Sequence, residues 1–112
     1  MKFSIDKDQI INEFQSLAAV ADKKQTLPIL SNILIRCEED KVKFLSTDLE
    51  VELEVAIPGA TIEGPGETTI PAKKAADIIR ELPDGKVSFE LIEDSSKLTV
   101  KSSSGKYNLS TI

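Results

Sequence analysis

The feature that most constrains the fold is an order of sequence patterns that occurs twice along the 112 residues. In each copy a short alternating stretch precedes an amphipathic stretch with helical spacing, and three alternating stretches follow. The three-strand parts correspond to 33–55 and 87–111, with an acidic turn at the same place in both. We therefore infer one domain over 1–112 that uses a β-α-β-β-β unit twice, over about 1–57 and 67–112.

The second predicted helix, within 68–85, has the clearest signal in the chain. Pro71 suits the first turn of a helix because its missing N–H needs no partner there. The Pro-Asp-Gly sequence at 83–85 ends the helix. Its apolar stripe comprises Ala72, Ala75, Ala76, Ile79 and Leu82, and its polar face comprises Lys73, Lys74, Asp77, Arg80 and Glu81.

The first predicted helix spans 6–21, where Asp6 and Gln9 form a pair that resembles a capping box. Glycine and proline at 58–67 predict a loop between the two halves. Each helix needs an apolar surface to cover its stripe, and each set of strands offers one. We therefore predict an α+β fold with both helices on one side of two antiparallel sheets. The predicted strands cover 2–5, 32–37, 41–45, 49–57, 67–70, 86–92, 97–101 and 106–111.

The composition argues against most enzyme classes. The chain has no histidine, which removes the commonest general base and the histidine-based nucleophile and metal systems. It also lacks glycine-rich nucleotide-binding motifs. We predict a non-catalytic protein without cofactor or metal. The single cysteine, Cys37, and the lack of an apolar stretch of signal-peptide or membrane-spanning length favour a cytoplasmic location.

The charge is distributed unevenly between the predicted helices and strands. The net charge is −5, yet 7–24 is neutral and 72–82 is net positive. The remainder holds eight basic and fourteen acidic residues. Chance together with solvated strand faces would explain this, and so would a helical face that meets an anionic partner.

The carboxylates at 48–54 form a row on one side of the predicted strand 49–57, opposite five apolar side chains. A metal site or an acid–base pair is one interpretation of this row. A solvated sheet face is the simpler one, because four acids in a line on one strand do not converge on a point. Such a row also protects a strand from unwanted edge pairing.

Several stretches together resemble the N-terminal domain of the bacterial DNA polymerase III beta subunit, the replication sliding clamp. They are MKFSIDKDQI at the start, TLPILSNILI at 26–35, STDLEVELEV at 46–55, TIPAKKAADIIRELPDG at 69–85 and YNLSTI at the end. The resemblance covers the whole chain in order. It implies the DNA-clamp fold.

The resemblance also implies a function. Members of this family have three domains of this fold and form a head-to-tail homodimeric ring whose helices line a central hole. Duplex DNA passes through the hole without sequence readout, and the ring tethers the DNA polymerase III catalytic subunit after a clamp loader places it. The family's polymerase-binding pocket lies between the second and third domains. This chain ends before those domains, so we expect it to fold alone and not to encircle DNA by itself.

The resemblance assigns two sets of site residues. The family's DNA-facing basic positions fall on Lys24 and Lys73, with Lys23 and Arg80 as plausible neighbours. Where the family often has arginine at the first two positions, lysine keeps the charge but loses the bidentate fork. The ring-closing edge falls on the second helix and the last strand, at Lys74, Lys106, Tyr107 and Leu109.

Two other functions stay open at this point. The exposed last strand, 106–111, would let the chain act as a protein-interaction module that adds a strand to a partner's sheet. An enzyme that uses the carboxylates at 48–54 is the third hypothesis, and it requires divalent-metal binding.

Overall fold

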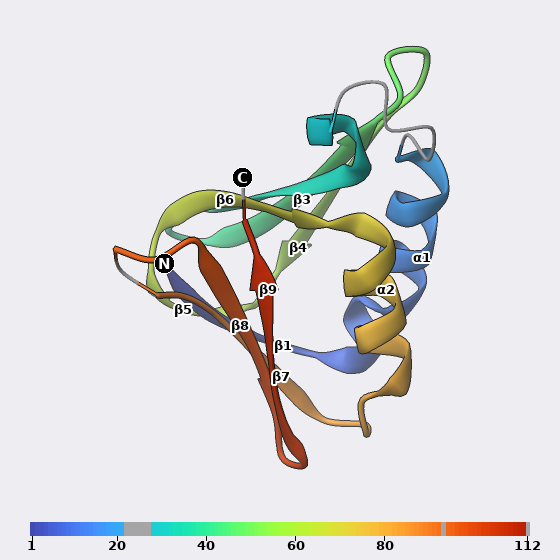
Figure 1. The fold of residues 1–112 in the computed structure, drawn as a ribbon. Helices are drawn as coiled ribbons and strands as arrows, with labels where there is room; N and C mark the ends of the chain where they lie inside the picture. Colours follow the sequence, from blue (N-terminus) through green and yellow to red (C-terminus); the bar gives the residue numbers. More distant parts are fainter. Residues whose placement is uncertain (22–27, 93, 112) are drawn as a thin grey trace.

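Two helices lie side by side against two antiparallel sheets in the computed structural model, which describes residues 1–21, 28–92 and 94–111 (Figure 1). The first half contains β1 (Lys2–Asp6), the 3-10 helix η1 (Lys7–Gln9), α1 (Ile11–Val20), η2 (Pro28–Ser31), β2 (Asn32–Cys37), β3 (Lys41–Thr47) and β4 (Glu52–Pro58). The second half contains β5 (Thr61–Gly64), β6 (Gly66–Pro71), α2 (Ala72–Glu81), β7 (Lys86–Leu91), β8 (Lys97–Ser102) and β9 (Gly105–Ser110).

Each sheet combines strands from both halves of the chain. The four-stranded sheet has the order β4-β3-β2-β6, and the five-stranded sheet has the order β5-β1-β7-β8-β9. Strand β1 therefore pairs with β7 of the second half, and β6 pairs with β2 of the first half. The two halves exchange the strands that precede their helices, β1 and β6, so neither sheet is complete without the other half.

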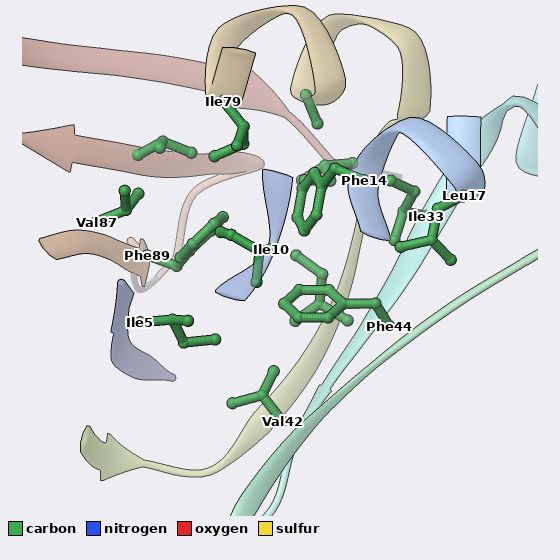
Figure 2. Close-up of a cluster of buried hydrophobic side chains, with 14 of the residues drawn as sticks. Ile5, Ile10, Phe14, Leu17, Ile33, Val42, Phe44, Ile79, Val87 and Phe89 are labelled. Carbon is green, nitrogen blue, oxygen red and sulfur yellow. The ribbon is translucent and has the colours of Figure 1, made fainter. Parts of the chain in front are cut away.

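One hydrophobic core fills the space between the sheets and the helices (Figure 2). All four phenylalanines of the protein meet there. Phe3 of β1 stacks on Phe89 of β7 at 4.8 Å between ring centroids, and Phe14 of α1 meets Phe44 of β3 edge-on at 5.0 Å. Pairs of this kind add about 0.5–1.5 kcal/mol beyond the burial of their area. The cluster joins both sheets and α1.

Helix α2 confirms the predicted apolar stripe. All five of its predicted apolar residues are buried, and the helix ends at Glu81, with Leu82 as its C-cap. Pro71 is the N-cap residue and the last residue of β6, so the helix begins one residue later than predicted. The sequence Leu82 to Gly85 then turns the chain into β7.

The predicted start of the first helix is wrong. Asp6 makes no side-chain capping hydrogen bond, and 7–9 form the 3-10 turn η1 before α1 begins at Ile11. Ile10 breaks the helical geometry with φ −127° and ψ −10° while its side chain is fully buried. Burial of this isoleucine in the core decides the local conformation, at the cost of a continuous helix.

Two strand predictions also need correction. The predicted loop 58–67 contains β5, which pairs with β1 so that Phe3 faces Ile62. The predicted strand 49–57 begins only at Glu52, because Leu49 lies in a tight turn with φ 81°. Leu49 and Val51 are therefore exposed, and they do not share the buried face of the strand as the alternation predicted.

Lys7 is an unusual buried lysine that joins the two halves. Its Nζ donates hydrogen bonds to the carbonyl oxygen of Arg80, at 3.1 Å, and to that of Leu82. Its backbone N–H donates to the carbonyl oxygen of Gly85 at 2.8 Å. Carbonyls in the last turn of a helix have no helical partner and carry partial negative charge, so an ammonium group there satisfies and stabilises them.

The turn between β3 and β4 is held by its own side chains. Asp48 Oδ1 accepts hydrogen bonds from the backbone N–H groups of Glu50, at 2.9 Å, and Val51, at 2.8 Å. Thr47 Oγ1 accepts from the N–H of Leu49 at 3.0 Å and donates to the carbonyl oxygen of Val51 at 2.7 Å. The two backbone donors hold the pKa of the Asp48 carboxyl below its ordinary value.

We predict that Lys7→Met lowers the free energy of unfolding by about 2 kcal/mol, because it leaves buried carbonyls at the end of α2 without their charged donor. Urea unfolding followed by circular dichroism measures this. Lys86→Met, at an exposed lysine on β7, is the control and should change the stability by less than about 0.5 kcal/mol. Equal effects of the two variants would contradict a capping role for Lys7.

We predict that the turn 47–51 loosens in acid. The folded pKa of Asp48 lies below the ordinary value of about 3.9, so its contribution is complete above that value and is lost as the pH falls through the folded pKa. Carboxyl carbon shifts and amide exchange at Glu50 and Val51, followed by NMR against pH, report both events. A titration midpoint at or above about 3.9 would contradict the bonding of this turn.

Candidate nucleic-acid interface

A groove of about 490 Å³ runs between α1 and α2 on the side of the molecule away from the sheets. Small side chains let the two helices approach one another. From α1 the groove is lined by Gln15, Ala18 and Ala19, and from α2 by Ala72, Lys73, Ala76, Asp77 and Arg80. Among the described residues that line it, the groove thus carries two cations and one carboxylate, all from α2.

The two cations of the groove have different surroundings. Arg80 Nη2 lies 2.9 Å from Asp77 Oδ1, one helical turn away on α2, and its Nε lies 3.9 Å from Glu81 Oε1. Lys73 is exposed and forms no ion pair with any residue that the structure describes. Lys73 is therefore the cation most available to an anionic ligand, while Arg80 shares its charge with Asp77.

The structure brings together Lys73 and Arg80 of the four predicted DNA-binding residues. Lys23 and Lys24, the other two, lie outside the described residues. Sequence reasoning missed the contribution of α1, whose Gln15 and Ala19 line the same groove. The sequence predicted both helices on one side of the sheets, but it did not single out these two residues.

The predicted ring-closing residues divide between α2 and β9. Lys73 and Lys74 project about 100° apart around the helix axis, and Lys74 does not line the groove. Strand β9 is an edge of the five-stranded sheet and pairs only with β8. On β9, Tyr107 is 42% exposed and Lys106 is exposed, whereas Leu109 is 7% exposed and packs in the core. Only the first two present side chains at this edge.

Sequence analysis did not identify Lys101, which lies on β8 next to the edge strand β9. Lys101 of β8 stands directly opposite Lys106 of β9, and neither lysine forms an ion pair with a described residue. Like charges directly opposite each other on a sheet are destabilising. The register of the predicted hairpin 97–111 would have revealed the pair. The pair of facing lysines indicates that this edge suits an acidic partner.

The acidic row at 48–54 does not converge on a point. Asp48 and Glu50 lie in the turn, while Glu52 and Glu54 lie on exposed positions of β4. Within the described ranges, no group of three or more metal-ligating side chains is close enough to hold a metal ion. No helix in those ranges is long and apolar enough to span a membrane.

Comparison with known proteins identifies the family. The family model of the DNA polymerase III beta subunit, N-terminal domain, matches residues 1–112. The chain belongs to this family. The groove and the β9 edge described above are therefore interpreted by comparison with members of this family.

Relatives of this beta-subunit domain are sliding clamps. The chain is 37% identical over 112 residues to the beta sliding clamp of Pseudomonas aeruginosa and 37% identical over 115 residues to that of Vibrio cholerae, and it covers 30% of each. A crystal structure of the DNA polymerase sliding clamp of Caulobacter crescentus superposes with a TM-score of 0.92 at 34% identity, over all of this chain and 30% of that one. The likeness confirms the DNA-clamp fold: two helices on two antiparallel sheets, built from a duplicated β-α-β-β-β unit. The chain spans about a third of the length of these relatives.

Proposed function

We propose that this chain is the first domain of a ring-shaped sliding clamp, a non-catalytic processivity factor of DNA replication. In the complete ring, a head-to-tail homodimer, the α1–α2 side faces duplex DNA. The ring holds the DNA polymerase III catalytic subunit on its template after a clamp loader has placed it there, and it acts in the cytoplasm. The observation that carries the proposal is the match of the whole chain to the beta-subunit family.

The electrostatics of the helical face support this role. Lys73 is available to phosphate, Arg80 is partly neutralised by Asp77, and the α1 side of the groove is uncharged. Neutralising few phosphates gives weak attraction that salt weakens further. A protein that must slide along DNA needs attraction of this kind, because a closed ring holds its DNA by topology. We propose that Lys23 and Lys24 add to the same face.

Ring closure through the β9 edge is the second part of the proposal. An edge strand offers unpaired backbone groups for strand addition. Lys106 and the facing Lys101 supply positive charge at this edge, and Tyr107 supplies a half-exposed aromatic ring. Lys74 is an exposed cation of α2 that we propose joins the same contact. Aromatic anchors dominate the energetics of many interfaces. The side chain of Leu109 is buried, so Leu109 would contribute to ring closure by holding β9 against the core and not by direct contact.

We predict that the double variant Lys73→Glu/Arg80→Glu impairs clamp function in a chimera. The chimera carries this chain in place of the matching segment of the Pseudomonas aeruginosa beta sliding clamp. After loading onto nicked circular plasmid, the unaltered chimera should stay bound until the plasmid is linearised. The double variant should be loaded and retained at least about threefold less at low salt, because repulsion replaces phosphate attraction.

The matched control is Lys2→Glu/Lys86→Glu, which reverses two solvent-accessible charges on the strands β1 and β7, away from the α1–α2 groove and from β9. It should behave as the unaltered chimera does. Equal losses in both double variants would contradict the assignment of the helical face. A folded chimera that linearisation does not release, or that is never retained, would contradict the clamp proposal itself.

We predict that Tyr107→Lys weakens dimerisation of the same chimera about tenfold or more, because it removes an aromatic anchor and adds a like charge beside Lys106. Analytical ultracentrifugation over a concentration series measures the dissociation constant. Ile92→Lys is a close control, since Ile92 is also 42% exposed but follows β7, away from β9 in the sheet order. An unchanged dissociation constant for Tyr107→Lys would exclude Tyr107 from the ring-closing contact.

A further inference from the structure

A second pocket lies on the four-stranded sheet, on the face that points away from the helices. Its floor is a row of side chains on three neighbouring strands, where Leu34 of β2 faces Leu45 of β3 on one side and Thr69 of β6 on the other. Ile29 and Leu30 of η2 form one wall, and Thr47 lies at one end. The volume is about 230 Å³, and the lining is almost entirely apolar.

The pocket contains a buried polar atom without a partner. Asn32 lines it and is 8% exposed. Its Nδ2 donates to the carbonyl oxygen of Pro28 at 2.9 Å, while its Oδ1 has no hydrogen-bond partner among the described residues. A buried acceptor without a donor is unfavourable, because it has lost its hydrogen bonds to water. A ligand that brings an N–H group into this pocket would supply the missing donor.

The surroundings of the pocket add apolar surface. Ile29 is 46% exposed, and Leu49 and Val51 in the adjoining turn are 73% and 53% exposed. The turn holds Leu49 in a left-handed conformation, which is strained for a residue that is not glycine. Thr47 is common to the pocket and to this turn, whose bonds it anchors. The chain thus uses a strained, well-bonded turn to display an apolar side chain next to an apolar pocket.

Negative charge borders the pocket on its β4 side. In the register of β3 and β4, Glu52 stands opposite Thr47 and Glu54 stands opposite Leu45. Both carboxylates are exposed, and neither forms an ion pair with a described residue. On this side anionic ligands are therefore disfavoured, and a ligand with positive charge beside its apolar part is favoured.

We propose that this pocket binds an extended peptide from a partner protein, in which bulky aliphatic residues stand next to lysine or arginine. An aliphatic side chain fills the space over Leu34 and Leu45, and the N–H group of the same peptide residue donates to Asn32 Oδ1. The basic residues lie against Glu52 and Glu54. Nucleic acid fits this chemistry less well, because the β4 side of the rim carries two carboxylates.

The position of the pocket separates it from the α1–α2 groove. Residues that alternate with the pocket floor, such as Ile33 and Phe44, point into the core toward α1. The peptide site and the helical face therefore lie on opposite sides of the four-stranded sheet. A partner bound at the pocket would leave the helical face free, so this inference does not rest on the proposed function.

The test uses the 112-residue chain labelled with ¹⁵N and the synthetic peptide acetyl-Gly-Ile-Leu-Lys-Lys-Gly-amide. In a titration followed by NMR, saturable shift changes should appear at Leu34, Leu45, Thr47 and Leu49 and not on α1 or α2. Replacing both aliphatic residues of the peptide with serine should abolish saturation. Methylating the backbone nitrogens of those two residues should weaken binding about fivefold or more, because the donor to Asn32 is lost.

Variants of the protein complete the test. Leu45→Ser should weaken binding about fivefold or more. Glu52→Gln/Glu54→Gln should weaken it about threefold or more at low salt and less at high salt, whereas Glu39→Gln/Glu90→Gln, at exposed carboxylates elsewhere, should not. Dispersed spectra verify that each variant is folded. No saturable shifts, equal shifts with the serine peptide, or shifts centred on other surfaces would overturn the proposal.

Discussion

The exchange of β1 and β6 between the two halves is the constraint on which the rest of the structure depends. Strand β1 completes the sheet of the second half, and β6 completes the sheet of the first half. The four phenylalanines connect the result, because Phe3 stacks on Phe89 within one sheet while Phe44 comes from the other. Neither half can bury its aromatic residues alone. The duplicated sequence therefore yields one cooperative unit, where two independent small units would each have too little core.

The exchange also places the helices. Helix α1 follows β1 in one sheet and leads to β2 in the other, and α2 makes the reverse crossing from β6 to β7. Both helices thus bridge the two sheets on the same side and lie against each other. Lys7, immediately after β1, reaches the end of α2 because β1 runs beside β7, and its ammonium group closes that helix. One polar contact between the halves therefore fixes the end of the helix that carries Lys73 and Arg80.

Patterns within single elements could be predicted from the sequence, and contacts between elements could not. The stripe of α2 and the alternation of β2, β3, β7 and β8 follow from spacing alone. Leu49 departs from the strand pattern because it lies in a turn whose backbone is bonded by Asp48. Ile10 departs from the helical pattern because its side chain is buried in the core. The partners of β1 and β6, the short β5 and the burial of Lys7 depend on residues distant in sequence. The groove forms where the two helices meet, so the periodicity of one helix alone could not show which residues of α1 line it.

The strand register shows a role for Glu52 and Glu54, two members of the acidic row at 48–54, that composition alone does not indicate. On a solitary edge strand, exposed glutamates only discourage pairing with other chains. Here the same glutamates stand beside Thr47 and Leu45, so their charge borders an apolar pocket as well as a sheet edge. The cations of α2 lie beyond the core on the other side of that sheet. In the proposed roles, this segregation keeps the cations that attract phosphate on one side of the sheet and Glu52 and Glu54 on the other, where basic and apolar protein segments are the complementary partners. One small domain can thereby present opposite charge to two kinds of partner without competition between them.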